Sequence, residues 1–298
     1  MLISVIIVNW NRLDDMNETL FSLRSQTYKD YEIVVVDNDS NDGSVEMIEK
    51  KYPHVKLVKS TNNLGCEGGF NLGMKNSTGD IFFYLDSDAS LSENVLERVY
   101  EEFSRNPKLG ILDPRIINPH NNLIINEPKN WPKKNHFTGC AAAIRRSVVE
   151  KIGMRPAEYF IYTSEADLCL RTINADYTIE HFSDIVAFHR ESPKKRLSSK
   201  FYYYYTRNGL WLIWKFYPFF PAVKETIIHL SYNFTKSLLA LSPWHFFIGL
   251  FEGLRDFKKY SLNKRQPIKA YNDARLYPQV RTIISILFDK IKGLGLKK

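Results

Sequence analysis

The sequence predicts an α/β protein built on a mostly parallel sheet flanked by helices, with a helical C-terminal extension. Short uncharged runs of β-branched, aromatic and aliphatic residues, typical of strands buried on both faces, alternate with stretches whose apolar residues recur at helical spacing. The 298 residues are enough for one large α/β domain and a smaller appendage. Because parallel strands need crossover connections, this alternation places helices on the faces of the sheet.

The N-terminal part contains the predicted elements in strand and helix order. The predicted strands cover residues 4–8, 32–36, 55–58 and 81–85. The predicted helices carry their apolar residues at Leu13, Met16, Leu20 and Leu23, at Val45 and Ile48, and at Val95, Leu96, Val99 and Phe103. The start of the chain lacks the basic segment and the small-residue cleavage site of a signal peptide, so we expect it to form the first strand.

Charge divides the chain into two parts. Residues 193–298 carry 20 Lys and Arg against 5 Asp and Glu, a net of +15, whereas residues 1–192 carry 21 against 28, a net of −7. The change falls in a polar loop-like segment, so we predict a domain over 1–200 and a basic, aromatic-rich helical region over 201–298. Three cysteines without metal-finger spacing are typical of a reducing cytosol.

The most informative stretch is Asp86-Ser87-Asp88, directly after the predicted strand 81–85. The C-terminal ends of strands are where open α/β sheets bind ligands. Two hard oxygen ligands there suit a divalent cation that also binds substrate phosphate. Two carboxylates one residue apart are a weak signal by themselves, since such pairs also occur in ordinary turns.

Two further polar loops are expected at the same sheet edge. Residues 9–11 follow the first strand and residues 37–44 follow the second, and their short polar side chains can bind a base or ribose or simply form turns and helix caps. A third loop, residues 62–73, has four glycines in nine residues, which permits close approach of backbone to a phosphate or sugar. Its spacing matches neither a dinucleotide fingerprint nor a P-loop.

These motifs, in this order, resemble family 2 glycosyltransferases of the GT-A fold, and bacterial rhamnosyltransferase-like members in particular. The resemblance covers about residues 3–215 and makes residues 1–200 a catalytic GT-A (Rossmann-like) domain. It implies inverting sugar transfer from a nucleotide-diphosphate sugar, with rhamnose from dTDP-rhamnose as the expected donor and Mn²⁺ or Mg²⁺ as cofactor. The implied donor-binding residues are Asn9, Asn11, Asp37, Asn38, Asn63, Gly65, Gly69, Asn71, Asp86, Ser87, Asp88 and Gly139.

Residues 160–171 resemble the acidic motif of that family, commonly Glu-Asp-x-Asp-Leu followed by Arg. Ser164 stands at the first acidic position, and Glu165 takes the second, which in the family is the general base. The chemistry requires such a group, because an acceptor hydroxyl is a poor nucleophile until a carboxylate takes its proton. Glu165 is therefore the expected base and Asp167 the alternative, although acids in a first helical turn are also favoured by the helix dipole.

His189 follows the apolar run 185–188, and the resemblance makes it a metal ligand together with Asp88 and Asp86. Asp88 is the expected direct ligand, whereas Asp86 is expected to orient the ribose or a metal-bound water. The ordinary alternative is a partly buried structural histidine.

The C-terminal region is apolar and aromatic in residues 211–220 and 243–251, but prolines and charges interrupt both runs before they could span a bilayer. A last helical face at Val280, Ile283, Ile284, Leu287 and Ile291, beside several lysines, suits an anionic membrane interface. We therefore expect a cytoplasmic protein, peripheral on the inner face of the cell membrane, with a glycan or lipid-linked acceptor. The alternative is a helical subdomain packed on the core.

Other functions fit the sequence less well. Basic residues interleaved with aromatics can bind nucleic acid, but the first two-thirds of the chain is acidic and has no binding motif, so no nucleic-acid partner is expected. A nucleotidyltransferase could share the carboxylate pair but would need a Gly-rich triphosphate loop near its N-terminus. A non-catalytic carbohydrate-binding or scaffold protein on the same fold is left open by Ser164.

Overall fold

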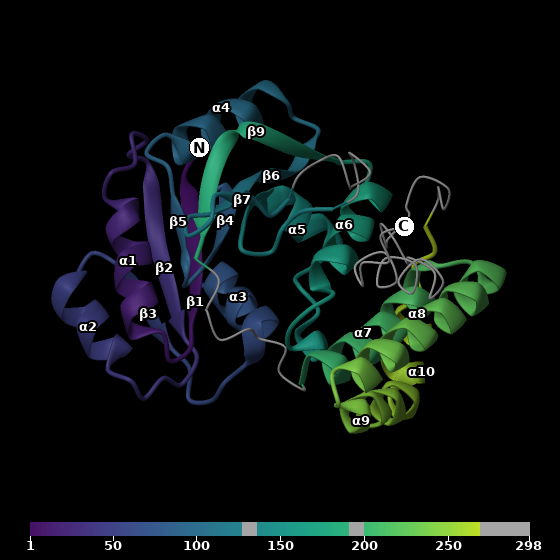
Figure 1. Ribbon diagram of the computed structural model, residues 1–298. Helices are drawn as coiled ribbons and strands as arrows, with labels where there is room; N and C mark the ends of the chain where they lie inside the picture. The colour runs from purple at the N-terminus through teal and green to yellow at the C-terminus, as the bar shows by residue number, and fades with distance from the viewer. Residues whose placement is uncertain (127–135, 191–199, 269–298) are drawn as a thin grey trace, which may run out of the picture. The chain divides into compact units, whose positions relative to one another are not determined.

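The computed structural model describes residues 1–126, 136–190 and 200–268 (Figure 1). The chain divides into two compact units, Met1–Lys194 and Lys195–Lys298, and each is described by itself. The predicted helical face at residues 280–291 lies outside the described residues.

The first unit alternates strands and helices, as the sequence predicts. Its strands are β1 (Ile3–Asn9), β2 (Tyr31–Asp37), β3 (Lys56–Lys59), β4 (Ile81–Asp86), β5 (Ala89–Leu91), β6 (Leu109–Asn118), β7 (Leu123–Ile124), β8 (Ala141–Arg145) and β9 (Thr178–His189). Its helices are α1 (Leu13–Leu23), α2 (Ser44–Lys51), α3 (Gly65–Lys75), α4 (Val95–Arg105), α5 (Arg146–Ile152) and α6 (Ser164–Asn174), with a 3₁₀ turn over Ala157–Tyr159.

The strands form one sheet in the order β3-β2-β1-β4-β8-β6-β9-β5, with β7 paired to β6. The expected α/β class is confirmed, and β1 pairs in parallel with β2 and β4, as β2 does with β3. Beyond β4 the sheet is mixed, because β8 runs antiparallel to both β4 and β6 and β5 runs antiparallel to β9. The strand-helix alternation that predicts parallel pairing ends after β4, where β5 follows without a helical crossover.

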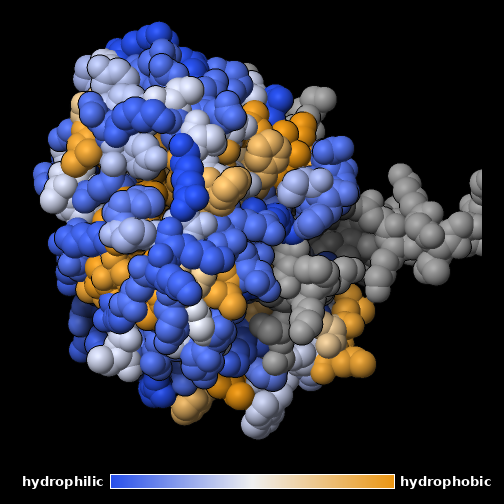
Figure 2. All heavy atoms as spheres, turned by 90° about the vertical axis from the view of Figure 1, so that its left-hand side faces the viewer, coloured by the Kyte–Doolittle hydropathy of each residue, from blue (hydrophilic) through white to orange (hydrophobic). Residues whose placement is uncertain are grey.

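Helices cover both faces of the sheet because its strands are apolar on both sides. In β1, Ile3, Val5 and Ile7 join a core cluster with α1, α2 and α4. Ile6 points to the opposite face, where it joins a cluster with α3, α5 and α6. This alternation is the period of two expected of a strand. The side of the molecule that carries α1 and α2 presents a mostly hydrophilic surface (Figure 2).

Helix α3 lies very close to the sheet, and two glycines permit the approach. A Cβ atom at Gly73 would lie 2.3 Å from Cγ2 of Ile6, and one at Gly69 would lie 2.6 Å from Cγ1 of Val8. Any larger side chain would push α3 away from β1. Part of the glycine-rich pattern therefore serves helix-sheet packing.

The second unit is helical over its described residues. It contains α7 (Lys200–Phe216), α8 (Phe219–Leu239), α9 (Pro243–Arg255), α10 (Phe257–Tyr260) and a 3₁₀ turn over Leu262–Lys264. Arg207 of α7 is buried. Its guanidinium lies 3.5 Å from the carboxylate of Glu252 on α9 and over the ring of Trp211. Among the helices described, none combines the length and apolar character needed to cross a membrane.

Glu32 of β2 provides a test of the first unit's stability. One oxygen of its carboxylate accepts hydrogen bonds from the hydroxyls of Ser4 and Thr78 and from the backbone N–H of Gly79. Burial by itself would raise the pKa of Glu32, but these hydrogen bonds outweigh burial and lower it. The ionised form is thus favoured in the folded state, and its contribution is lost as pH falls through the lowered pKa.

We expect Glu32→Gln to lower the urea midpoint of the full chain at pH 7, because charged hydrogen bonds become neutral ones. The two proteins should converge as pH falls below the ordinary glutamate range, about 4.3. Urea unfolding at pH 7 and at pH 3.5 measures both effects, with Glu46→Gln at an exposed position of α2 as the control. A midpoint difference that is unchanged at low pH would contradict the assignment.

Candidate active site

Three parallel strands end at the same sheet edge, and each is followed by a polar loop. Asn9 at the end of β1 is paired in register with Asp37 at the end of β2. Val8 is paired with Asp86 at the end of β4. The loops after β1, β2 and β4 therefore meet, as the strand assignment predicted.

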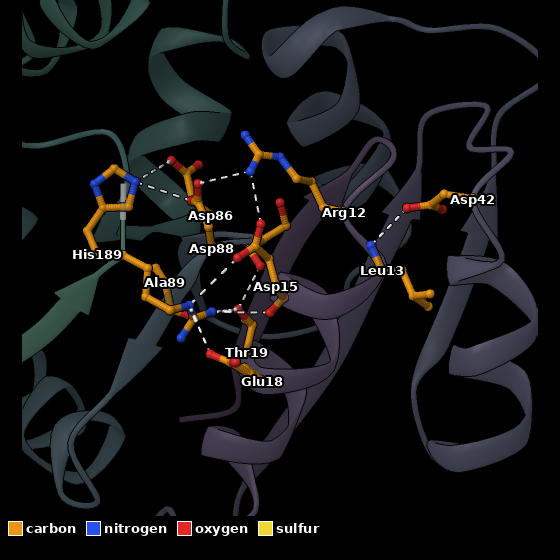
Figure 3. A network of polar contacts seen from close by, with 12 residues as sticks. Arg12, Leu13, Asp15, Glu18, Thr19, Asp42, Asp86, Asp88, Ala89 and His189 are labelled. Carbon is orange, nitrogen blue, oxygen red and sulfur yellow. Dashed lines mark hydrogen bonds and ion pairs between the residues drawn. The ribbon is translucent and has the colours of Figure 1, made fainter. Parts of the chain in front are cut away.

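A carboxylate-histidine cluster lies at this edge. Asp88 belongs to the turn between β4 and β5, and Ala89 of β5 pairs with His189 at the end of β9. Nε2 of His189 lies 3.2 Å from Oδ1 of Asp88 and 4.0 Å from Oδ2 of Asp86 (Figure 3). One ligand atom from each of the three residues falls within 4.8 Å of the others. The structure thus brings together all three predicted metal ligands.

Helix α1 supports the turn that carries the two aspartates. The hydroxyl of Thr19 lies 2.8 Å and 2.7 Å from the carbonyl oxygens of Ser87 and Ala89. Arg190, which follows β9, donates to the same hydroxyl at 3.0 Å and to the carbonyl of Asp15 at 3.1 Å. The turn is consequently fixed to α1 and to the end of β9 at once.

The two aspartates have different electrostatic surroundings. Burial, then the charge of Asp88, raises the pKa of Asp86 to about 7, and the charge of Glu165 adds to the increase. Burial would also raise the pKa of Asp88, but His189 and the Arg12 guanidinium outweigh it, so that this pKa is lowered. Arg12 Nη1 lies 4.0 Å from Oδ2 of Asp88. Acids this close together favour a cation among them.

The donor atoms of this cluster fit a divalent cation such as Mn²⁺. Carboxylate oxygens suit Mg²⁺ and Mn²⁺, and an imidazole nitrogen is a common ligand of transition metals. Three protein atoms are fewer than an octahedral ion requires, so substrate phosphate and water would supply the remaining ligands. The cluster therefore suggests use of a divalent metal.

The predicted nucleotide-binding residues after β1 and β2 contact one another. Asn9 is buried, and its Nδ2 donates to Oδ1 of Asp37 at 3.1 Å and to the hydroxyl of Ser40 at 3.2 Å. The other oxygen of Asp37 accepts from the Ser40 N–H, and Oδ1 of Asn11 accepts from the Asn41 N–H. Oδ1 of Asn9 is buried and has no hydrogen-bond partner among the described residues. Asn9 is thus a buried residue that positions Asp37 and Ser40 at the sheet edge.

The residues predicted in the glycine-rich loop make mainly structural contacts. Asn38 donates to the carbonyl of Gly65 at 2.9 Å, and Asn63 accepts from the N–H of Gly65 at 2.8 Å. Both polar atoms of the Asn71 amide bond the backbone of Arg155, at 2.8 and 3.0 Å. These contacts explain the residue types without a ligand, and a donor-binding role for them stays a prediction.

Glu165 lies at the start of α6, next to Gly139. A Cβ atom at Gly139 would lie 2.3 Å from Oε1 of Glu165, so a larger residue there would displace the Glu165 carboxylate. The loop before α6 has positive φ at Phe160, Tyr162 and Thr163, at 65°, 65° and 71°. Strained backbone of this kind is concentrated at functional sites. Glu165 thus follows a strained loop, and its side chain is 23% exposed.

Asp167 has a different environment from Glu165. It is fully buried, and its carboxylate accepts from Nε of Arg171 at 2.6 Å and from the hydroxyl of Tyr159 at 3.4 Å. Arg171 also donates to the carbonyls of Ile152 and Gly153. Arg171 thus connects α6 to the end of α5, and its ion pair with Asp167 lies within α6.

Sequence reasoning missed one pair of charged residues beside this site. Glu67 and Arg155 form an ion pair in which each side chain is 1% exposed, and the guanidinium also reaches Glu165 at 3.5 Å. One sequence signal was available, because Glu67 shares a helical face with the buried Phe70 and Met74. No local pattern points to Arg155.

Comparisons with known proteins agree with this geometry. The model of the family described as glycosyl transferase family 2 matches residues 4–153. An uncharacterized glycosyltransferase of Nostoc sp. is 32% identical over 191 residues, which are 57% of this chain and 58% of the relative. Poly-beta-1,6-N-acetyl-D-glucosamine synthase of Staphylococcus epidermidis is 31% identical over 120 residues, 39% of this chain and 29% of the relative. The matches thus span less than two thirds of these relatives.

Two solved structures show the fold. The mannosyltransferase PcManGT of Pyrobaculum calidifontis, in complex with GDP-Man and Mn²⁺, has a TM-score of 0.61 at 18% identity and covers 99% of this chain and 81% of its own. Staphylococcus aureus TarS 1–349 in complex with UDP-GlcNAc has a TM-score of 0.62 at 19% identity, with 87% and 81% covered. The predicted GT-A fold with a helical C-terminal region is confirmed, whereas the rhamnosyltransferase-like subtype stays a prediction.

The family model extends from the first strand to the end of α5, which is half of the chain, and it includes the edge where Asp86 and Asp88 lie. The chain therefore belongs to glycosyl transferase family 2, and the expectation of a transferase enzyme is confirmed at the level of the family.

Proposed function

We propose that the protein is an inverting, metal-dependent glycosyltransferase that moves a sugar from a nucleotide-diphosphate donor to a glycan or lipid-linked acceptor in cell-surface polysaccharide synthesis. The observation that carries this proposal is the cluster of Asp86, Asp88 and His189 at the sheet edge. A metal-diphosphate site beside a partly exposed carboxylate is what direct sugar transfer requires.

In the proposed reaction Glu165 takes the proton of the acceptor hydroxyl as its oxygen attacks the anomeric carbon. The bond from that carbon to the diphosphate oxygen breaks in the same step, so the configuration inverts and the nucleoside diphosphate leaves with the electron pair. A bound divalent cation supplies positive charge that stabilises the leaving diphosphate. Asp88, His189 and Asp86 would hold the cation.

Glu165 is favoured over Asp167 as the base because of their contacts. The Asp167 carboxylate is buried and engaged by Arg171, so it cannot meet an acceptor hydroxyl without breaking that ion pair. Glu165 retains an exposed fraction of 23%. Gly139 brings backbone against Glu165, which is consistent with its assignment near the donor sugar.

The leading donor is dTDP-rhamnose, from the resemblance to rhamnosyltransferases. The structural neighbours bind GDP-Man and UDP-GlcNAc, so the donor panel should include dTDP-, GDP- and UDP-sugars. Stabilisation of the native state by one of these ligands in the presence of Mn²⁺ would identify the donor, since a ligand that binds only the folded protein raises its stability.

Metal binding can be tested without turnover. We expect Asp88→Asn and His189→Ala each to weaken Mn²⁺ binding by at least ~10-fold, because each removes a ligand atom. Electron paramagnetic resonance of free Mn²⁺, titrated with protein and a nucleoside diphosphate at pH 7.5, measures the affinity. Asp14→Asn, at an exposed position of α1 outside the polar loops, is the control for the change in charge. Unchanged affinity in both site variants would refute the metal site.

Catalysis is tested by donor turnover, with and without acceptor. We expect Glu165→Gln to reduce turnover by about 10²-fold or more, the usual contribution of a general base, without loss of Mn²⁺ binding. Asp88→Ala should lose both turnover and Mn²⁺ binding. Glu150→Gln, an exposed acid on α5, should behave as the wild type. Equal turnover in all these proteins would exclude the mechanism, and pyrophosphate release from a nucleoside triphosphate would indicate a nucleotidyltransferase instead.

A membrane surface is the proposed site of action. On α9, Trp244, Phe247, Phe251 and Leu254 are exposed by 49–70% and recur at helical spacing, which gives one solvent-facing apolar stripe. Basic Arg255 and Lys258 follow it and are exposed. An aromatic stripe beside cations suits a helix that lies in an anionic membrane interface.

We expect the triple change Trp244→Ser, Phe247→Ser and Phe251→Ser to reduce flotation of the full chain with anionic liposomes. Phe21→Ser, which removes an exposed aromatic residue of α1 in the first unit, is the matched control. Neutral liposomes should bind less than anionic ones, because the basic residues contribute. Undiminished flotation of the triple variant would rule out this stripe as the binding surface.

A further inference from the structure

The buried ion pair between Glu67 and Arg155 is the most unusual interaction outside the metal cluster. Nε of Arg155 lies 2.5 Å from Oε2 of Glu67, and each side chain is 1% exposed. The guanidinium also packs over the rings of Phe70 and Tyr84, at 4.8 and 4.9 Å from their centroids. Removing two charges from water is costly, so such a pair is weak evidence of stability for its own sake.

Arg155 joins this pair to the proposed base. Its Nη2 donates to the hydroxyl of Ser164 at 3.0 Å and lies 3.5 Å from Oε1 of Glu165. The same Oε1 lies against the backbone of Gly139. Oε1 of Glu165 thus faces Arg155, and within the described part of the chain no hydrogen bond is made to Oε2. Oε2 is the oxygen left to receive a proton.

Ser164 lies next to Arg155, at a position where the acidic motif commonly has a carboxylate. Ser164 is fully buried. Its hydroxyl and the carboxylate of Glu67 both contact the guanidinium of Arg155. Burial raises the pKa of Glu67, whereas the adjacent Arg155 guanidinium lowers it and so favours the carboxylate form. An acidic group that is absent at position 164 is therefore supplied beside it by α3.

We propose that Glu67 provides from α3 the buried negative charge that the motif lacks at Ser164, and that Arg155, held by Glu67, is a positioning residue for Glu165. Without Glu67, Arg155 has Glu165 as its nearest remaining counter-ion and would draw that carboxylate toward itself. The positioning of Glu165 by Arg155 rests on the proposed function. The replacement of an acid at position 164 by Glu67 does not depend on it.

Relocating the charge tests the first half of the proposal. Glu67→Ala should lower the urea midpoint by about 1 M, because Arg155 is left buried without its partner. Ser164→Glu alone should also destabilise, because two like charges would meet one guanidinium. The double variant, with the acid moved to position 164, should recover most of both losses. Additive losses in the double variant would overturn the proposal whether or not the chain transfers sugar.

Measurements of turnover test the second part of the proposal, that Arg155 positions Glu165. With the donor identified by the panel, Glu67→Ala and Arg155→Met should lower kcat by ~10- to 100-fold, the cost of misplacing a reacting group by about an ångström. The KM for the donor and the Mn²⁺ affinity should not change, because the metal cluster is intact. The double variant should regain kcat.

Arg145→Met is the control for lost stability, because Arg145 bonds the carbonyls of Phe103, Asn106 and Leu109 and takes no part in the site. It should destabilise the protein without lowering kcat. Unaltered kcat in the folded Glu67→Ala protein would remove the positioning role.

The outcomes separate the two proposals. A wild-type chain that turns over no nucleotide-sugar, together with recovered stability in the double variant, would refute the proposed function and support the relocated charge. If Glu67→Ala does not fold, folding of the double variant supports the relocation, and failure of both overturns it. Glu67→Gln, which keeps the volume and the acceptor oxygen, then provides the turnover measurement.

Discussion

The pairing of β5 with β9 is the interaction on which the candidate active site depends. Asp86 and Asp88 are placed by β4 and its following turn, but their histidine partner comes from a strand about a hundred residues later in the chain. Three backbone pairs between Ala89–Leu91 and Ala187–His189 fix that distance, and Thr19 and Arg190 tie both segments to α1. The cluster therefore rests on regular structure rather than on a free loop, which favours a preformed site.

The opposite side of the site depends on a different kind of constraint. Glu165 follows a loop with three positive φ angles in non-glycine residues, and its carboxylate lies beside Gly139 and Arg155. Strained backbone persists only where surrounding contacts determine it, and the buried Glu67 partner of Arg155 contributes such contacts. Strand pairing thus positions the candidate metal ligands, whereas the buried ion pair of Glu67 and Arg155 lies next to the proposed base Glu165.

The sequence predicts well what depends on local periodicity. The first strands and helices, the loops at the sheet edge and the acids at 86 and 88 follow from runs of apolar residues and the polar residues that end them. Glu165, in contrast, is identified through the resemblance of residues 160–171 to the acidic motif of the family. The antiparallel half of the sheet does not follow, because β5 and β8 are short and are specified by distant partners. Asn71 and Gly69 show a second limit of sequence-based prediction. Both residue types are typical of a ligand-binding loop, but here Asn71 bonds the backbone of Arg155 and Gly69 packs against Val8.

The same limit explains why the pair of Glu67 and Arg155 is invisible to motif reasoning. The two residues are separated by 88 positions, and although Glu67 shares a helical face with Phe70 and Met74, no spacing pattern connects it to Arg155. A motif records which residue occupies a position, whereas a carboxylate acts through where its charge lies. At Ser164 the residue differs from the common pattern but a buried negative charge stays within reach of the same arginine. A departure from a catalytic motif is consequently weak evidence for lost activity until the charges around that position have been located in three dimensions.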